Sequence, residues 1–257
     1  MHSPQEDNFS APLGTPKFWL FDMDDTMYDA THSVFEAIHP RMERFIRERL
    51  GVSEQEAARL QHGYWERYGA TFLGLAMHHA IAPEEFLAAA HDFNVEEAVS
   101  RSAHPRALCE LIRRLPGQKA VLTNGPRAYA DRVLRTLGVR DAFKFSVTAN
   151  DMHVMGAWRC KPDSVLLLHA CRRAGVKPQD TVMIDDSLAN LKVAHELGMR
   201  TVWCTGYRHA NAVRRPAYVD VAVPSIEGLA RLVAPRKAPS VSRVKLRLMN
   251  HQDKESD

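Results

Sequence analysis

The second half of the sequence alternates short apolar segments with helical ones, and this alternation limits the possible folds more than any other feature. The segments at residues 119–123, 181–185 and 200–204 are typical of buried strands, because each is short, mostly apolar and contains β-branched residues. The helical segments between them begin at Pro or Ser and end at Gly. Strands that alternate with helices of this length predict right-handed crossovers and a parallel sheet. A fourth apolar segment, at residues 17–21, fits the same sheet.

Between the first strand and residue 105 the pattern is helical throughout. Apolar residues recur at spacings of three and four from Val34 to Leu50, and Ser53 followed by Glu56 resembles a capping box for the next helix. Pro40 lies inside the first of these patterns, so we expect it to kink or split that helix. No strong strand pattern interrupts the stretch, which predicts an all-helical insert.

Together these patterns predict an α/β fold, in which a Rossmann-like core with a parallel sheet carries an inserted all-helical domain. The predicted division is residues 1–16 as a flexible N-terminal arm, 17–30 and 105–225 as the core, 31–104 as the helical insert, and 226–257 as a partly flexible C-terminal extension. Long polar segments without apolar periodicity, as at both ends, bury too little surface to order themselves.

Composition and charge argue against several classes of protein. The net charge is +3, from 34 Lys and Arg against 31 Asp and Glu, which is too small to predict a nucleic-acid polymer or a membrane as partner. No run of 18 apolar residues is present, and residues 1–16 lack the apolar segment of a secretory signal. The four cysteines lie far apart and form no CxxC pair, so we expect reduced thiols in a cytoplasmic protein.

Polar side chains follow several of the predicted strands, at the point where each strand ends. They are Asp22, Asp24 and Asp25 after the first strand, Thr123, Asn124 and Gly125 after the second, Asp185 and Asp186 after a later one, and Lys161 in a loop before a helix. Ligands of open parallel sheets bind at the carboxyl ends of the strands, so we expect these residues to meet. Taken alone, Asp25 is more typical of a turn or a helix cap, and the Thr-Asn-Gly segment of an ordinary turn.

This set of residues suits a divalent metal and a phosphoryl group. Clustered carboxylates repel one another unless a cation neutralises them, and oxygen ligands favour a hard ion such as Mg²⁺. Thr123 and the backbone N–H groups after it can hold phosphoryl oxygens, while Lys161 offers a positive charge to the transition state. We found no Ser-His-Asp or Cys-His set that would supply another nucleophile. A carboxylate nucleophile that forms an aspartyl-phosphate uses every part of the set.

Four short motifs resemble those of the haloacid dehalogenase (HAD) superfamily. They are FDMDDT (21–26), LTNG (122–125), Lys161-Pro162 and MIDDS (183–187). The resemblance extends over about residues 17–225, and the helical insert lies where this superfamily has its type-one cap. Within the superfamily the chain is most similar to the pyrimidine 5′-nucleotidase branch. That likeness rests on RMERFI (41–46), YWERYGATFLGL (64–75) with His79, the HDF segment (91–93), LPGQK (115–119) and LGMRTVW (197–203).

The resemblance implies a role for each motif residue. Asp22 corresponds to the nucleophile and Asp24 to the general acid and base, while Thr123 and Lys161 correspond to the residues that hold the phosphoryl group. Asn124 and Gly125 would assist in substrate binding through the turn. The implied metal ligands for Mg²⁺ are Asp22, Asp24 through its backbone carbonyl, Asp186 directly and Asp185 through water, with the last two roles interchangeable.

One residue differs from the pattern of the pyrimidine 5′-nucleotidase branch, and another distinguishes the reactions that members of the superfamily catalyse. Asp25 stands where this branch commonly has Asn, which adds a negative charge beside the metal site. Asp24 favours a phosphatase or a phosphomutase over a dehalogenase, because a halide leaves without a proton, whereas an alkoxide must be protonated. The dehalogenases of the superfamily lack this Asp.

The substrate must be selected by the helical insert, since the core motifs do not contact the leaving group. The aromatic stripe of Tyr64, Trp65, Tyr68 and Phe72 is more typical of a helix core, but Tyr64 and Tyr68 could also stack on a base, and Arg41 could bind its edge. We therefore predict a phosphatase for a small phosphate ester, with a pyrimidine nucleoside 5′-monophosphate as the first choice. A phosphoglycolate or sugar phosphate phosphatase, a phosphomutase, a silent HAD-like binding protein and a receiver-type domain are the alternatives.

Overall fold

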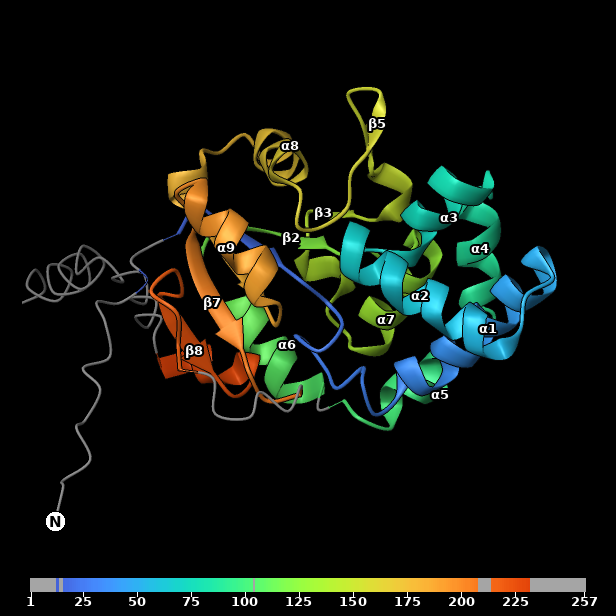
Figure 1. Ribbon diagram of the computed structural model, residues 1–257. Coiled ribbons are helices and arrows are strands. Elements are labelled where there is room, and N and C mark those ends of the chain that lie inside the picture. The colour runs from blue at the N-terminus through green and yellow to red at the C-terminus, as the bar shows by residue number, and fades with distance from the viewer. Residues whose placement is uncertain (1–12, 14–15, 104, 208–213, 232–257) are drawn as a thin grey trace, which may run out of the picture.

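The computed structural model describes residue 13 and residues 16–103, 105–207 and 214–231 (Figure 1). Most of the predicted N-terminal arm and most of the C-terminal extension therefore lie outside the described residues. Leu13, within the predicted arm, is buried in an apolar cluster. The 3₁₀ helix η4 (Ile226–Arg231) contributes Ile226 and Leu229 to the same cluster, so the first residues of the predicted extension pack against the core.

The main sheet has six strands, all parallel, in the order β3-β2-β1-β6-β7-β8. Its strands are β1 (Phe18–Phe21), β2 (Gln118–Leu122), β3 (Phe145–Val147), β6 (Thr181–Asp185), β7 (Arg200–Cys204) and β8 (Val221–Val223). The strand that comes first in the sequence lies in the middle of the sheet, between β2 and β6. The predicted α/β fold with a Rossmann-like parallel sheet is confirmed.

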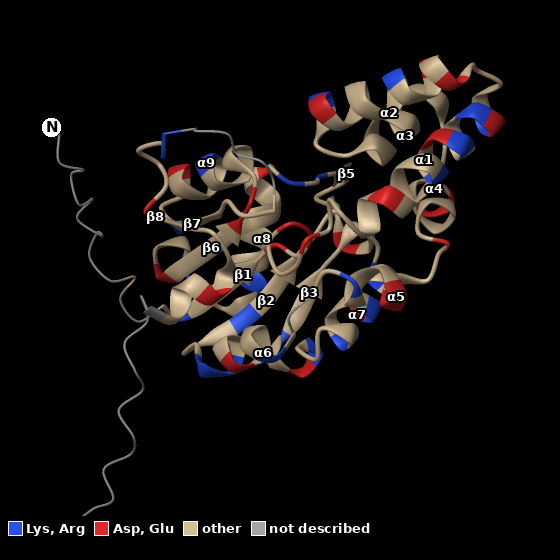
Figure 2. Cartoon of the chain, turned by 90° about the horizontal axis from the view of Figure 1, so that it is seen from below, with Lys and Arg blue, Asp and Glu red and all other residues tan. Residues whose placement is uncertain are grey.

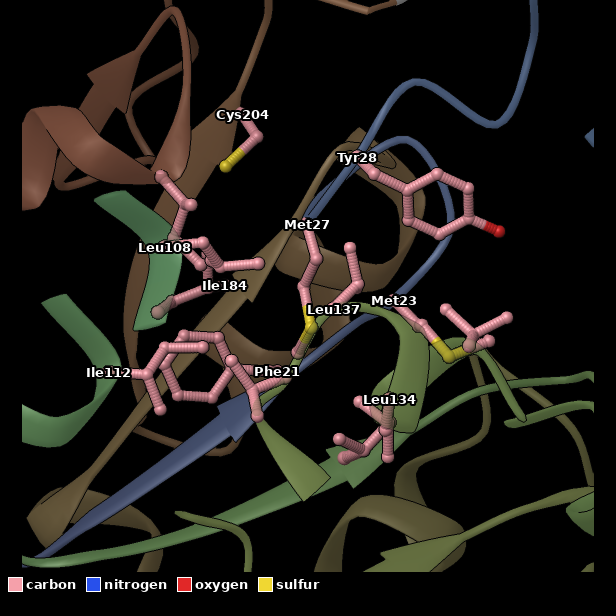
Figure 3. Close-up of a cluster of buried hydrophobic side chains, with 14 of the residues drawn as sticks. Phe21, Met23, Met27, Tyr28, Leu108, Ile112, Leu134, Leu137, Ile184 and Cys204 are labelled. Carbon is pink, nitrogen blue, oxygen red and sulfur yellow. The ribbon is translucent and has the colours of Figure 1, made fainter. Parts of the chain in front are cut away.

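Side chains of β1 alternate between two apolar layers, because successive residues of a strand point to opposite faces. Trp19 and Phe21 pack in one layer, and Phe18 and Leu20 in the other. Figure 3 shows part of the first layer, where Phe21 lies among side chains from the covering helices. The helices of the first layer are α6 (Pro105–Arg114) and α7 (Arg127–Thr136), and those of the second are α8 (Ser164–Ala174) and α9 (Leu188–Glu196).

The segment between β1 and α6 is helical in all its regular elements, as predicted. Its helices are α1 (Val34–Leu50), α2 (Glu54–Tyr68), α3 (Thr71–His79), α4 (Pro83–Ala90) and α5 (Val95–Ser100), which we call the helical insert. Helix α1 runs unbroken through Pro40, so of the kink or split that we expected, the split does not occur. Proline removes one backbone hydrogen bond, and the packing of α1 against α2 and α4 holds the helix together across that position.

The insert lies beside the sheet, and its last helix is anchored to the core (Figure 2). Helix α5 packs on α7, where Val95 and Val99 share an apolar cluster with Val133. At the edge of this contact the Arg132 Nε atom donates a hydrogen bond to Glu96 Oε1 at 2.8 Å. This contact fixes one end of the insert against the core.

A small antiparallel hairpin of β4 (His153–Val154) and β5 (Ala157–Trp158) was not predicted from the sequence. Strands of two residues are too short to show an alternating pattern, and the turn residues Met155 and Gly156 are not a typical turn pair, although both have positive φ. Three short 3₁₀ helices complete the described structure: η1 (Arg140–Ala142), η2 (Ala149–Asp151) and η3 (Pro178–Asp180).

The sequence pattern predicts a helix from Pro162 to Ala174 and a later helix capped by Ser187, and the structure differs from each prediction in one detail. Helix α8 begins at Ser164 rather than Pro162, because the Asp163 side chain accepts a hydrogen bond from Leu166 N at 3.0 Å and caps the helix. Ser187 occupies the cap position of α9, as predicted, but its side chain makes no capping bond. Its backbone N–H instead donates to Asp185 Oδ1 at 2.8 Å.

Across the part of the chain that the structure describes, no helix has both the length and the apolar character needed to cross a bilayer. All four cysteines are described, and each is a free thiol in the structure.

The apolar layer beneath α6 leads to a stability prediction. Ile112 is fully buried there, so Ile112→Ala removes contacts and leaves a cavity, which we expect to cost about 2–5 kcal/mol of the free energy of unfolding. Arg113→Ala, at the next and exposed position of the same helix, should change it by less than about 0.5 kcal/mol. Urea unfolding measures both, and equal losses would show that α6 does not pack as described.

Candidate active site

The carboxylates that follow β1 and β6 lie side by side because these strands pair in parallel. In their register Phe21 of β1 lies opposite Ile184 of β6. The next residues are Asp22 and Asp185, and the Asp22 N–H donates to Ile184 O at 2.9 Å. The sheet therefore brings together two carboxylates from segments that are distant in the sequence.

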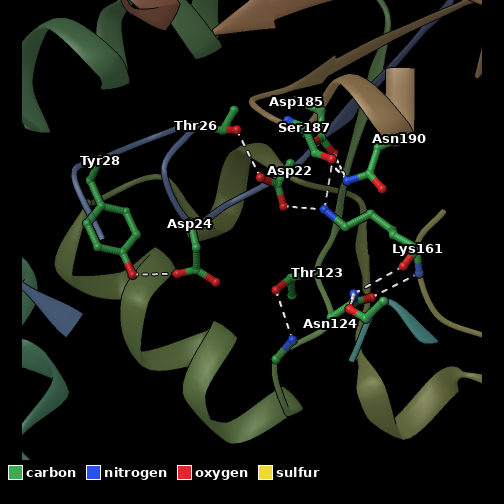
Figure 4. Close-up of polar contacts among 12 residues, drawn as sticks. Asp22, Asp24, Thr26, Tyr28, Thr123, Asn124, Lys161, Asp185, Ser187 and Asn190 are labelled. Carbon is green, nitrogen blue, oxygen red and sulfur yellow. Dashed lines mark hydrogen bonds and ion pairs between the residues drawn. The ribbon is translucent and has the colours of Figure 1, made fainter. Parts of the chain in front are cut away.

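A single lysine lies between the two carboxylates (Figure 4). Lys161 Nζ donates to Asp22 Oδ1 in a short contact and to Asp185 Oδ2 at 3.1 Å. All three side chains are buried. Burial alone would lower the pKa of Lys161, but the carboxylates of Asp185 and Asp22 raise it above its ordinary value. The lysine is therefore a permanent positive charge at this point.

Both carboxylates accept further hydrogen bonds that fix their orientation. Thr26 Oγ1 donates to Asp22 Oδ2 at 2.9 Å. Asn190 Nδ2, from the first turn of α9, donates to both oxygens of Asp185 at 2.9 and 3.0 Å. Burial raises the pKa of Asp185, while Lys161 opposes that shift.

A third carboxylate completes a possible metal site. One oxygen from each of Asp22, Asp185 and Asp186 lies within 4.8 Å of the other two. The donors are all carboxylate oxygens, which is the ligand type that hard divalent cations prefer. Three carboxylates against one lysine also leave an excess of negative charge. The residues present therefore fit a divalent cation, as the sequence predicted.

Asp24 lies apart from this cluster and is held by two tyrosines. Tyr28 and Tyr129 donate from their hydroxyl groups to Asp24 Oδ1 at 2.6 and 2.5 Å. Desolvation raises the pKa of Asp24 to about 7, although the two tyrosine hydrogen bonds lower it. A carboxyl group with this pKa can both donate and accept a proton near neutral pH.

The turn after β2 places a hydroxyl group opposite the carboxylates. Thr123 is buried, and its Oγ1 accepts a hydrogen bond from Gly125 N at 3.0 Å. Because that bond uses the oxygen as an acceptor, the hydroxyl proton of Thr123 remains available as a donor. Gly125 also gives room to Tyr129, since a Cβ atom there would lie 2.9 Å from the Tyr129 ring.

Asn124, which we predicted to bind substrate, uses its side chain within the protein although it also lines the cavity. Its Oδ1 accepts from Lys161 N at 3.1 Å, and its Nδ2 donates to Gly69 O at 3.1 Å. The amide thus connects the loop that carries Lys161 to the turn between α2 and α3. That turn approaches the loop closely, because a Cβ on Gly69 would lie 2.2 Å from Lys161 O.

A cavity of about 1570 Å³ lies between the helical insert and the ends of the strands. On the core side it is lined by the predicted site residues Asp22, Asp24, Thr123, Asn124, Gly125, Lys161 and Asp186. On the insert side it is lined by aromatic and apolar residues, including Trp65, Tyr68, Phe72 and Met77. Trp158 of the hairpin also lines the cavity and packs edge-to-face on Phe72, with ring centroids 6.0 Å apart.

Of the three insert residues predicted to bind substrate, Tyr68 lines this cavity, whereas Tyr64 and Arg41 do not. The Tyr64 hydroxyl contacts His79 Nε2 at 2.7 Å, and its ring packs between α2 and α3 over Gly74. Arg41 donates to the backbone carbonyls of Asp92 and Ala37 at 2.9 and 2.8 Å. Tyr64 thus joins α2 to α3, and Arg41 joins α1 to the loop between α4 and α5.

Asp25 has the turn role that its sequence position also allowed. It is buried with a φ of 56°, and its oxygens accept from Thr31 N and Thr31 Oγ1 at 2.8 and 2.6 Å. Sequence reasoning missed Tyr28, Tyr129 and Asn190, because the partners of these side chains are set by the fold rather than by a motif. Only Asn190 had a signal, as a polar residue in the first turn after the Asp185-Asp186 pair.

Comparison with known proteins identifies the family. A model of the haloacid dehalogenase-like hydrolases matches residues 17–198. The chain belongs to this family. It is also 26% identical to a phosphoglycolate phosphatase of Pseudomonas putida, with 95% of this chain and 89% of that protein aligned. It is 25% identical to validoxylamine A 7′-phosphate phosphatase of Streptomyces hygroscopicus, with 80% and 92% aligned. The predicted HAD superfamily and the phosphatase class are confirmed.

Solved structures support the same fold. A HAD phosphatase from Thermococcus onnurineus superposes with a TM-score of 0.58 at 22% identity, with 86% of this chain and all of that chain covered. A dehalogenase superposes with a TM-score of 0.53 at 17% identity, with 86% and 98% covered. Phosphatases and dehalogenases thus share this backbone, and their reactions must differ through the side chains of the site.

The close approach at Gly69 leads to a prediction for this HAD hydrolase. In Gly69→Ala the new methyl group meets Lys161 O, and the φ of 78° adds strain, so the Lys161 loop must shift. Because small misplacements of site groups are costly, we expect kcat/KM for p-nitrophenyl phosphate to fall roughly ten- to a hundredfold.

The matched control is Gly63→Ala, in the middle of α2, where the added methyl meets nothing within 4 Å. It should leave kcat/KM unchanged and stabilise the helix by roughly 0.5–1 kcal/mol. Unchanged activity of Gly69→Ala would show that the turn between α2 and α3 does not position the Lys161 loop.

Proposed function

We propose that this HAD phosphatase hydrolyses phosphate monoesters through a phosphorylated Asp22. The observation that supports this most directly is the division of roles between two nearby carboxyl groups. Asp22 accepts hydrogen bonds from Lys161 and Thr26, which fix the orientation of its carboxylate, whereas desolvation raises the pKa of Asp24 to about 7. A nucleophile must be held in place, and a proton donor must be able to carry a proton near neutral pH.

Mg²⁺ is the cation that we propose for the three-carboxylate site. Asp22 and Asp186 would hold it directly, together with the backbone carbonyl of Asp24. Asp185, whose two oxygens accept hydrogen bonds from Asn190 and Lys161, would act through water. When bound, the cation supplies positive charge that neutralises the carboxylates and the phosphoryl oxygens.

The residues of the chain account for both halves of the reaction. In the first half an Asp22 oxygen attacks phosphorus, the bond to the ester oxygen breaks, and Asp24 gives that oxygen its proton. In the second half Asp24 takes a proton from water, the water oxygen attacks phosphorus, and the bond to Asp22 breaks. Lys161 and the Thr123 hydroxyl hold the phosphoryl oxygens throughout.

For the substrate we propose a nucleoside 5′-monophosphate, with a pyrimidine base preferred. The insert side of the cavity offers Trp65, Tyr68 and Phe72, and Trp158 lines it from the hairpin. Flat aromatic side chains suit a planar base, whereas sugar hydroxyl groups would need short polar ones. Free thiols also fit a reducing compartment, and we propose the cytoplasm.

A second candidate substrate is phosphoglycolate, favoured by a relative that carries this name and aligns over 95% of the chain. Its two-carbon leaving group has no flat ring for the aromatic residues that line the insert side of the cavity. This aromatic lining is therefore the reason to place this candidate second.

A comparison of kcat/KM for UMP, CMP, AMP, phosphoglycolate and glucose 1-phosphate tests the proposal. With Mg²⁺ we expect UMP and CMP to lead by about tenfold or more, which is about 1.4 kcal/mol of transition-state binding. EDTA should abolish the activity. If kcat/KM for UMP and CMP is tenfold lower than for phosphoglycolate or glucose 1-phosphate, the nucleotide assignment is wrong and the phosphatase assignment remains.

The same proposal can be tested by changing the protein instead of the substrate, through substitution of Trp65. Stacking of a base on an aromatic ring contributes about 1–3 kcal/mol, so Trp65→Ala should lower kcat/KM for UMP by a corresponding factor. Met155→Ala is the matched control, because Met155 is also an exposed apolar residue but does not line the cavity. Equal effects of the two substitutions would exclude stacking on Trp65.

A further inference from the structure

Two tyrosines outside the four short motifs described above, Tyr28 and Tyr129, converge on Asp24. Tyr28 comes from the segment after β1 and Tyr129 from the first turns of α7. Both hydroxyl groups contact Asp24 Oδ1, at 2.6 and 2.5 Å, and they lie 2.6 Å from each other. Both side chains are almost fully buried. Buried hydroxyl groups need hydrogen-bond partners, and here the partner is the proposed proton donor.

The surroundings hold Tyr129 firmly in this place. On one side its ring packs against Gly125, where a Cβ atom would lie only 2.9 Å away. On the other side lies the ring of His91, whose centroid is 4.7 Å from that of Tyr129. Burial lowers the pKa of His91 to about 4, so this neighbour is neutral at physiological pH. Residue 125 must therefore be a glycine for the Tyr129 ring to occupy this position.

The hydrogen bonds distinguish the two oxygens of Asp24. Oδ1 accepts from both tyrosines, whereas no hydrogen bond from the described residues reaches Oδ2. Asp24 lines the cavity. Figure 4 shows the carboxyl group turned so that one oxygen meets Tyr28 and the other points away from it.

We propose that Tyr28 and Tyr129 are positioning residues that hold Asp24 by Oδ1 and present Oδ2 to the oxygen of the leaving group. The inference rests on the proposed role of Asp24 as the proton donor. The proton moves from Asp24 Oδ2 to the ester oxygen as the P–O bond breaks, while the tyrosine protons stay in place. The tyrosines should therefore have their largest effect on kcat/KM for substrates whose leaving group needs that proton.

The dependence on the leaving group gives the test. Phenyl phosphate releases a basic phenolate that needs protonation, whereas 2,4-dinitrophenyl phosphate releases a stable anion that does not. Tyr129→Phe and Tyr28→Phe should each lower kcat/KM for phenyl phosphate by about tenfold or more and change it less than about threefold for 2,4-dinitrophenyl phosphate. General acid catalysis is typically worth ~10²–10⁴-fold, and loss of orientation forfeits part of it.

Tyr218→Phe is the matched control, because this half-buried tyrosine packs in the other apolar layer and does not line the cavity. It should leave both substrates unaffected. Equal losses with both substrates, or no loss, in folded Tyr129→Phe and Tyr28→Phe would overturn the positioning role. Asp24→Asn tests the proposed function separately. If Asp24 is the proton donor, this variant must lose more kcat/KM for phenyl phosphate than the tyrosine variants do, and again much less for 2,4-dinitrophenyl phosphate. Thermal unfolding confirms that each variant is folded.

Discussion

Two buried carboxylates, Asp22 and Asp185, share the ammonium group of Lys161, and the rest of the site depends on this charge balance. A buried carboxylate without a partner would be protonated or would destabilise the fold. Lys161 meets that need for both residues at once, but Asp186 adds a third negative charge within the same small volume. One lysine leaves this cluster with an excess of negative charge. The excess explains why the site suits a divalent cation and, with it, a phosphoryl group.

The same residues that form the site also connect it to the helical insert. Asn124 bonds to the backbone of both Gly69 and Lys161, so the turn between α2 and α3 is tied to the loop of the lysine. On the other side of the cavity, His91 packs on Tyr129, which in turn reaches the proposed proton donor. The insert therefore does more than cover the cavity. Its position and the geometry of the reacting groups are linked through packed side chains.

Much of the fold follows from the sequence, because a buried parallel strand is a local apolar run. The strand at Thr181–Asp185 was predicted with its observed bounds, whereas the two-residue strands β4 and β5 carry too short a pattern. The motif carboxylates could likewise be predicted to meet, since parallel strands end at one edge. The contact of Tyr129 with Asp24 spans 105 residues and depends on how α7 is rotated. Helical spacing likewise could not show that Arg41 faces the loop between α4 and α5 rather than the cavity.

The central claim is that Asp22 carries the phosphoryl group during turnover, and trapping the phosphorylated enzyme tests it most directly. The enzyme is mixed with p-nitrophenyl phosphate and Mg²⁺, quenched in acid within a single turnover, digested and analysed by mass spectrometry. We expect the mass of one phosphoryl group on the peptide that contains Asp22, and none in Asp22→Asn. A phosphoryl group on another residue, or active enzyme that never carries one, would contradict the account.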